Sequence, residues 1–299
     1  MASAGRVLLI PKGAWISGAS YSMLDVVYYE GASYVAKGAV SGTTPPVYDT
    51  NSWQIMCSGL ETYSNAGAHN SIYRGKDLGD HVTDAQYAAI SAGTFEDLYI
   101  GDYWVINGVT WRIAAFDYYL HCGDTDLTTH HAVIVPDTCL YNHVMNDTNI
   151  TTGGYVGSKM YTEGLEQAKT TIKAAFSGHV LSHRVYLTNA VNDGHPSAGA
   201  WCDSEVDLMN EQMVYGDAIF MPIANGLTVY TNNRVEKSQL PLFAHEPSRI
   251  CNRNTWWLRD VVTASIFAFV NNNGVASTEF ASNSRGVRPA FCICKQNAA

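Results

Sequence analysis

Charged side chains are scarce in this sequence. Asp, Glu, Lys and Arg make up 15% of the 299 residues, whereas an average soluble domain has roughly 25%. The formal net charge is -9, and the few Lys and Arg residues form no cluster along the chain. Proteins that bind nucleic acid neutralise phosphates with such clusters, so we expect no nucleic-acid partner.

Long apolar runs are missing as well. No stretch approaches the roughly 20 apolar residues that a membrane-spanning helix needs. The opening stretch MASAGRVLLIPKG contains an apolar run that is too short for the core of a signal peptide. We therefore expect no membrane insertion and a chain that folds in a cytoplasm.

Motifs for catalysis and metal binding form the third absence. The seven cysteines include no CxxC pair, so buried free thiols are expected. The sequence has no Gly-x-Ser-x-Gly, phosphate loop or His-Glu-x-x-His. His130 and His131 lie near Asp124 and Asp126, but neighbouring strand residues point to opposite faces, which does not suit zinc. We expect no catalytic residue, no metal and no cofactor.

An aromatic hairpin is present near the start. In DVVYYEGASYVAK, residues 25 to 37, the pair Glu30-Gly31 separates two β-prone runs, and Gly takes a positive φ without steric cost. With a period of two, Tyr28 and Tyr29 point to opposite faces. A tyrosine face binds flat ligands such as sugars or packs a core, so both tyrosines are candidate binding residues.

Helix and hairpin signals follow along the chain. Capping and periodicity predict helices in VTDAQYAAISAG, TEGLEQAKTTIKAAFSG and SEVDLMNEQMVYG. Asn-Gly pairs at 107–108, 225–226 and 273–274 predict hairpins. Helices in the middle and hairpins at the end indicate an α+β fold.

The chain divides at a small, polar stretch, ETYSNAGAHNS, which is typical of an interdomain linker. We predict a small all-β module at 1–62, a linker at 63–78 and an α+β domain at 79–299.

The first segment resembles the small carbohydrate-binding modules attached to chitinases. These modules show the order W, Y, D-x-V-x-Y-x-G-x-x-Y-x-A-K, a Gly/Pro loop and a closing W. The residues of this chain that fit are Trp15, Tyr21, Asp25, Val27, Tyr29, Gly31, Tyr34, Ala36, Lys37, Pro45 and Trp53. Similar modules stand at the front of bacteriophage fibre and tail proteins. The enzyme-attached modules carry aromatics just after A-K, where this chain has Gly38, Ala39 and Val40, so the module either binds sugar or only attaches the chain to a particle.

The second part resembles phage structural proteins of Gram-positive gut bacteria. The stretches that carry the resemblance include WWLRD, FAFV, NNNG and the closing GVRPAFCI. The ending is similar to the C-type-lectin-like fold, which the formylglycine-generating enzymes also use. Lectins of this fold that bind sugar through calcium carry Glu-Pro-Asn or Gln-Pro-Asp and a Trp-Asn-Asp stretch. This chain has only Glu246-Pro247-Ser248, so calcium-dependent binding is not expected.

Together the resemblances imply a bacteriophage virion surface protein. It would be a tail or head fibre-type adhesin, assembled in the cytoplasm of the host bacterium, that contacts other virion proteins and binds host-surface carbohydrate or protein. By resemblance to fibre proteins it would be a homotrimer. The alternative is a structural decoration or baseplate component without a receptor, and an enzyme on the lectin fold comes third.

The polar excursion from Arg249 to Ser284 is the expected contact region, because loops between scaffold strands are exposed. Its amide side chains can bond a neutral ligand. The predicted contact residues are Asn252, Asn254, Trp256, Asn271, Asn272 and Asn283. Arg259 and Arg288 are expected to brace this surface by binding loop carbonyls.

Overall fold

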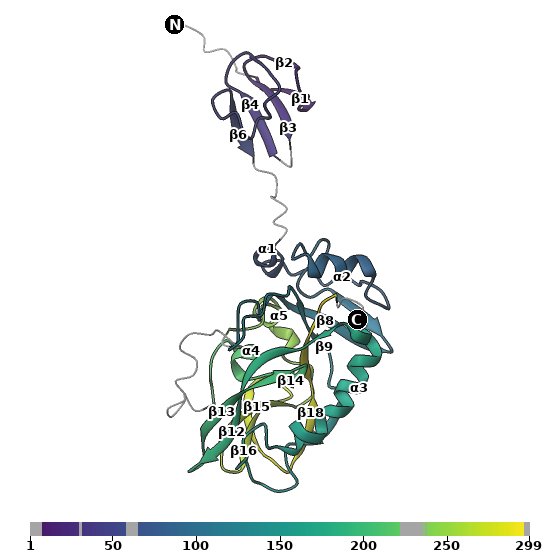
Figure 1. Ribbon diagram of the computed structural model, residues 1–299, viewed down its shortest axis with the longest axis vertical. Coiled ribbons are helices and arrows are strands. Elements are labelled where there is room, and N and C mark those ends of the chain that lie inside the picture. Colours follow the sequence, from purple (N-terminus) through teal and green to yellow (C-terminus); the bar gives the residue numbers. More distant parts are fainter. Residues whose placement is uncertain (1–7, 30–31, 58–64, 222–235, 237, 296–299) are drawn as a thin grey trace. The chain divides into compact units, whose positions relative to one another are not determined.

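The computed structural model describes residues 8–29, 32–57, 65–221, 236 and 238–295. They belong to two compact units, Met1–Tyr63 and Ser64–Ala299 (Figure 1). Each unit has its own hydrophobic core. The strands of the first unit are β1 (Ile10–Ala14), β2 (Ser20–Tyr21), β3 (Asp25–Tyr29), β4 (Ala32–Ala36), β5 (Val40–Ser41) and β6 (Trp53–Cys57).

The first unit is a small sheet in the order β1-β3-β4-β6, with β2 and β5 paired beside it. Strands β3 and β4 pair antiparallel from Val26 opposite Val35 to Tyr29 opposite Ala32. This is the predicted hairpin, although its Glu30-Gly31 turn lies outside the described residues. The hydrophobic core of this unit consists of Tyr21, Val27, Ala32, Tyr34, Ala36 and Trp53.

The second unit has more strands than helices. Its strands are β7 (Tyr103–Ile106), β8 (Val109–Phe116), β9 (Ala132–Pro136), β10 (Tyr141–Val144), β11 (Val180–Leu181), β12 (His183–Asn192), β13 (His195–Ser204), β14 (Val206–Leu208), β15 (Trp256–Thr263), β16 (Ile266–Val270), β17 (Ala276–Phe280), β18 (Ser284–Val287) and β19 (Pro289–Ile293). Its helices are α1 (Ala66–Asn70), α2 (Asp84–Ser91), α3 (Leu165–Phe176), α4 (Glu211–Tyr215) and α5 (Pro241–His245), with short helical turns η1 (Met160–Gly164), η2 (Ser177–His179) and η4 (Pro247–Arg249).

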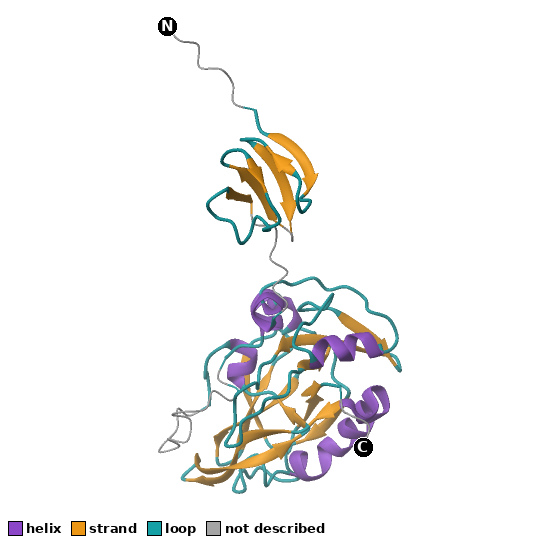
Figure 2. Cartoon of the chain, turned by 45° about the horizontal axis from the view of Figure 1, so that its top comes forward, coloured by secondary structure: helices purple, strands orange, loops and turns teal. Residues whose placement is uncertain are grey.

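Two sheets build this unit. One has the order β11-β19-β9-β8-β7, with β14 also paired to β19, and the other has the order β10-β18-β15-β16-β17. The chain passes from the second sheet to the first at the buried Arg288, which lies between β18 and β19. Strands β12 and β13 form a long separate hairpin. Figure 2 shows helices at the margins of these strands.

The α+β prediction is wrong, because the protein is mostly β, with 38% strand and 18% helix. Part of the error lies in SEVDLMNEQMVYG, residues 204–216, where the helix begins several residues after the predicted start. Val206–Leu208 is strand β14, which pairs with β19, and α4 begins only after Asn210 as its N-cap. Pairing with a neighbouring strand overrides the helical period there. The sequence interpretation also missed the whole β12–β13 hairpin.

Other local predictions are confirmed. Thr83 and Gln86 form a capping box on α2, and α3 buries Leu165, Ala168 and Ile172 along one stripe. The turn at 107–108 joins β7 to β8, and the turn at 273–274 lies between β16 and β17. The pair at 225–226 lies outside the described residues.

The predicted linker at 63–78 is also corrected. Its described residues, from Asn65 on, belong to the second unit. Asn65 caps helix α1, Tyr73 bridges to Ile100, and the Arg74 guanidinium binds the buried Asp102 carboxylate with a nitrogen–oxygen distance of 2.6 Å. Small polar residues form helix caps and turns here. Linkers have the same composition, so the sequence alone does not distinguish the two.

No helix within the described part of the chain has the length and apolar character needed to cross a membrane.

Removal of the Trp53 indole should unfold the first unit selectively. Trp53 is 2% exposed and its ring lies 5.2 Å from that of Tyr21, in a core of six residues. A buried Trp→Ala change costs about 3–5 kcal/mol, which is a large share of the stability of so small a module. In the full-length chain, Trp53→Ala should abolish the dispersed NMR signals of the described residues of the first unit and leave those of the described residues of the second unit in place. Retention of both sets would contradict the role of Trp53, and loss of both sets would contradict separate cores.

Candidate functional site

A buried ion pair lies at the centre of the second unit. The Arg259 guanidinium, from β15, binds both carboxylate oxygens of Glu236, and it also donates to the Leu208 carbonyl of β14 at 3.1 Å. The Tyr119 hydroxyl donates to the same carboxylate at 2.9 Å. Because β14 and β15 belong to different sheets, Arg259 joins the two sheets through hydrogen bonds.

Arg288 makes a second junction. It is fully buried, and its guanidinium donates to the carbonyls of Pro136 and Arg249, each at 2.9 Å. Its charge lies 5.0 Å from the centre of the Trp256 ring, a favourable cation–π arrangement. Both arginines were predicted to bind loop carbonyls, and both do bind backbone carbonyls. Leu208 and Pro136 are, however, the last residues of strands β14 and β9, and only Arg249 lies in a short helical turn, η4.

Two buried carboxyl groups adjoin this centre. Burial raises the pKa of Asp207 to about 6 and that of Asp260 to about 7. Asp207 accepts hydrogen bonds from Ser204 and Tyr155, and Asp260 accepts one from the Glu211 amide at 2.6 Å. These carboxyls have protein partners and serve the scaffold.

Four of the predicted contact residues meet on one surface. The loop at 251–254 lies against the turn at 271–274, because Cys251 Sγ contacts the Asn272 carbonyl at 3.4 Å. We call Asn252, Asn254, Asn271 and Asn272 the asparagine surface. The Asn252 side chain accepts from the Asn254 amide at 3.1 Å, and that of Asn271 accepts from the Asn273 and Val275 amides. Two asparagines thus fix the loops, while Asn254 and Asn272 are exposed.

The other predicted contact residues lie elsewhere. Trp256 is 0% exposed, so its expected place on the surface is wrong: its ring packs in the core beside Arg288. Asn283 is exposed but follows β17, at the opposite end of the β16–β17 hairpin from the asparagine surface. In the first unit, Tyr28 is 55% exposed, whereas Tyr29 packs edge-to-face on Trp15 at 5.4 Å.

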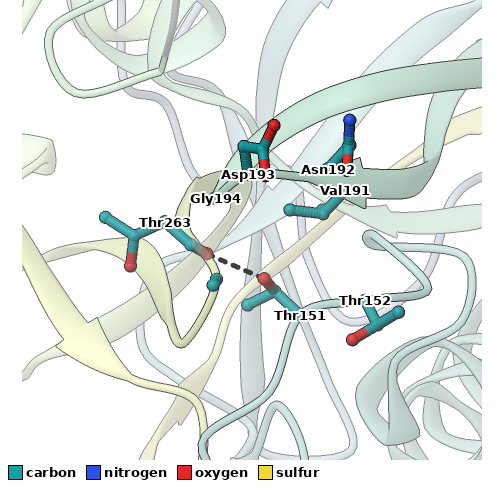
Figure 3. A pocket seen from close by; sticks show the side chains of 8 residues that line it. Thr151, Thr152, Val191, Asn192, Asp193, Gly194 and Thr263 are labelled. Carbon is teal, nitrogen blue, oxygen red and sulfur yellow. Dashed lines mark hydrogen bonds between the residues drawn. The ribbon is translucent and has the colours of Figure 1, made fainter.

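The sequence interpretation missed a concave site. A cavity of about 420 Å³ is lined by Thr151, Thr152, Val191, Asn192, Asp193, Gly194, Thr263 and Ala264 (Figure 3). These residues come from three segments: the loop at 151–152, the end of the β12–β13 hairpin, and the turn after β15. We call it the hairpin-tip pocket. The Asp-Gly pair at 193–194 is a hairpin signal that could have located one of its walls.

The residues that resembled a metal cluster do not come together. Each forms hydrogen bonds with a different partner. His130 bonds to Asp117 at 2.7 Å, and the His131 ring accepts from the Tyr119 amide at 3.1 Å. Asp124 accepts from Arg184 at 2.8 Å, and Asp126 bonds to His121 at 3.1 Å. Among the residues that the structure describes, no three His, Cys, Asp or Glu side chains are placed to hold a metal ion.

The cysteines near the chain end are set in the protein interior. Burial raises the pKa of Cys294 to about 11 and holds that of Cys292 well above its ordinary value. A reactive cysteine has a lowered pKa, so neither thiol has the property that thiol-based catalysis needs.

Comparison with protein families matches residues 203–295 to a domain of unknown function (DUF6273). The similarity covers less than half of the 299 residues. It includes the Arg259–Glu236 pair and the asparagine surface, but not the loop at 151–152 or the tip at 191–194. No curated protein and no solved structure matches the chain.

Loss of one partner of the buried ion pair should be costly. Arg259→Met leaves the Glu236 carboxylate buried without its counter-charge, which costs about 3–5 kcal/mol. Adding Glu236→Gln removes that charge and should restore part of the loss. Urea unfolding followed by tryptophan fluorescence measures both variants, and equal stability of Arg259→Met and the unaltered protein would contradict this role.

Asp260 should make stability depend on pH. Its pKa is raised from an ordinary value of 3.8 to about 7 in the folded protein, so the folded state holds the proton more tightly. Its contribution is complete below about pH 4 and is lost as the pH rises through about 7. Asp260→Asn stays neutral and keeps an oxygen that accepts from the Glu211 amide.

The free energy of unfolding of Asp260→Asn, relative to the unaltered protein, should therefore rise between pH 4 and 8. The expected change is on the order of 2–4 kcal/mol. The control is Asp217→Asn, which makes the same substitution at an exposed carboxylate. A pH-independent difference for Asp260→Asn would disprove the raised pKa.

Proposed function

We propose that this chain is a bacteriophage virion surface protein, a tail or head fibre-type adhesin that binds host-surface glycan or protein. The asparagine surface carries the proposal. Two loops that are distant in sequence are adjacent there, and side-chain hydrogen bonds to their own backbone fix their shape. Loops ordered before binding lose little conformational entropy when a ligand is bound.

The chemistry of this surface favours a neutral ligand. Exposed amides both donate and accept hydrogen bonds, which suits hydroxyl and amide groups. Arg288 and Arg259 connect the sheet that carries these loops to the other sheet. Single contacts of this kind are weak, so several copies on one particle, as in a trimer, supply the adhesion through avidity.

The first unit resembles chitinase-type modules, and it would have a role of its own beside that of the second unit. The outer face of β3 carries the exposed Tyr28, which is available either to sugar or to another virion protein. In the rival reading, the whole chain is a structural decoration or baseplate component, and its loops meet a virion partner.

Adhesion of the full-length chain to bacteria tests the proposal. We would biotinylate the N-terminus, assemble the chain on fluorescent streptavidin, and measure binding to a panel of Gram-positive gut bacteria by flow cytometry. The double variant Asn254→Ala/Asn272→Ala should weaken binding at least about tenfold. Its melting temperature should not change, because both side chains are exposed.

Asn283→Ala is the matched control, since it removes the same chemistry from the opposite end of the hairpin. It should bind as the unaltered chain does. Lack of binding to every strain, or normal binding by the double variant, would contradict an adhesin that uses the asparagine surface.

A further inference from the structure

The hairpin-tip pocket is built by contacts among its three walls. The Thr151 hydroxyl donates to the Thr263 carbonyl at 2.7 Å, a bond drawn in Figure 3, and the Thr151 amide donates to the Ala264 carbonyl at 3.0 Å. The Val191 amide donates to the Thr152 carbonyl at 3.1 Å. Each wall is thus tied to the loop at 151–152, and the cavity exists before any ligand enters. Ligand pockets are commonly preformed in this way.

The polar side chains of the pocket are available to a ligand. Thr152, Asn192 and Asp193 are exposed, and their side chains make no hydrogen bond to other described residues. Asp193 and Gly194 have φ angles of 50° and 79°, the left-handed geometry of a tight hairpin turn. This geometry fixes the backbone that carries Asn192 and Asp193. Residues that carry a hydroxyl, a carboxamide and a carboxylate therefore line one cavity.

The side chains that line the pocket favour one class of ligand over others. None of the eight residues drawn in Figure 3 is Lys, Arg or aromatic, and one is an aspartate. An anion would meet the Asp193 charge without a compensating cation, and a flat apolar ligand would find no ring to stack on. A ligand with many hydroxyls can donate to the carboxylate and exchange hydrogen bonds with the amide and hydroxyl. Its C–H groups can contact Val191 and Ala264.

We propose that the hairpin-tip pocket binds a small neutral saccharide through Asp193, Asn192 and Thr152. The volume of about 420 Å³ lies within the range of roughly 300–1,000 Å³ that is typical of small-molecule sites. The pocket and the asparagine surface adjoin opposite ends of β16, a strand of five residues, so they are separated by about 15 Å. The inference consequently stands apart from the proposed adhesion through the asparagine surface.

Saturation-transfer NMR on the full-length chain tests this inference. Glucose, galactose, N-acetylglucosamine and rhamnose would each be added at millimolar concentration. At least one should receive magnetisation from the protein, and its binding should not weaken with added salt, since neither hydrogen bonds to a neutral ligand nor apolar contacts are screened. Saturation transfer from none of the four sugars would overturn the proposal.

Three variants assign the binding to this cavity. Asp193→Asn keeps the turn, because Asn accepts the left-handed conformation, and it should weaken binding about tenfold through loss of the charge-assisted hydrogen bond. Ala264→Phe, at an exposed lining position, should fill the cavity and abolish binding. Asp217→Asn, the same substitution at an exposed carboxylate that does not line the pocket, is the matched control and should bind the sugar normally. Unchanged sugar binding by Ala264→Phe would place the ligand elsewhere and overturn the assignment, whatever the result of the cell-adhesion experiment.

Discussion

The ion pair between Arg259 and Glu236 is the interaction on which the second unit depends. Two charges are removed from water there, and this cost is offset only because each finds several partners: the Leu208 carbonyl for the guanidinium and the Tyr119 hydroxyl for the carboxylate. Leu208 belongs to β14 of one sheet, Arg259 belongs to β15 of the other, and Tyr119 lies in the turn after β8. A displacement of either sheet would leave a buried charge unpaired, so the pair fixes how the sheets pack.

This fixed packing gives the molecule rigid strands with polar loops at both ends. At one end of the β16–β17 hairpin the asparagine surface is held by side-chain hydrogen bonds to its own backbone. At the other, the hairpin-tip pocket is held by bonds from Thr151 to the turn after β15. In both places the exposed groups are mainly neutral donors and acceptors, in keeping with a sequence of low charge. Such surfaces gain affinity from preorganisation and from multiple copies.

Local signals in the sequence were reliable where neighbouring residues alone decide the structure. The capping box at Thr83 and the turns at 107–108 and 273–274 are examples. Prediction failed where distant partners decide: Val206–Leu208 became a strand because β19 lies beside it, and Trp256 is buried because Arg288 and the core surround it. The hairpin-tip pocket could not be predicted, since its walls are brought together only by the fold. Four of the six predicted contact residues in the excursion do share a surface, because flanking strands place their loops together.

The position of the chain on a particle tests the central claim most directly. Phage particles from cells that carry this sequence would be purified, checked for the chain by mass spectrometry, and imaged by cryo-electron microscopy. Our account predicts that the chain is present with the asparagine surface exposed to solvent and directed away from the particle. Absence of the chain, or an asparagine surface covered by another virion protein, would contradict the adhesin and, in the second case, favour a purely structural role.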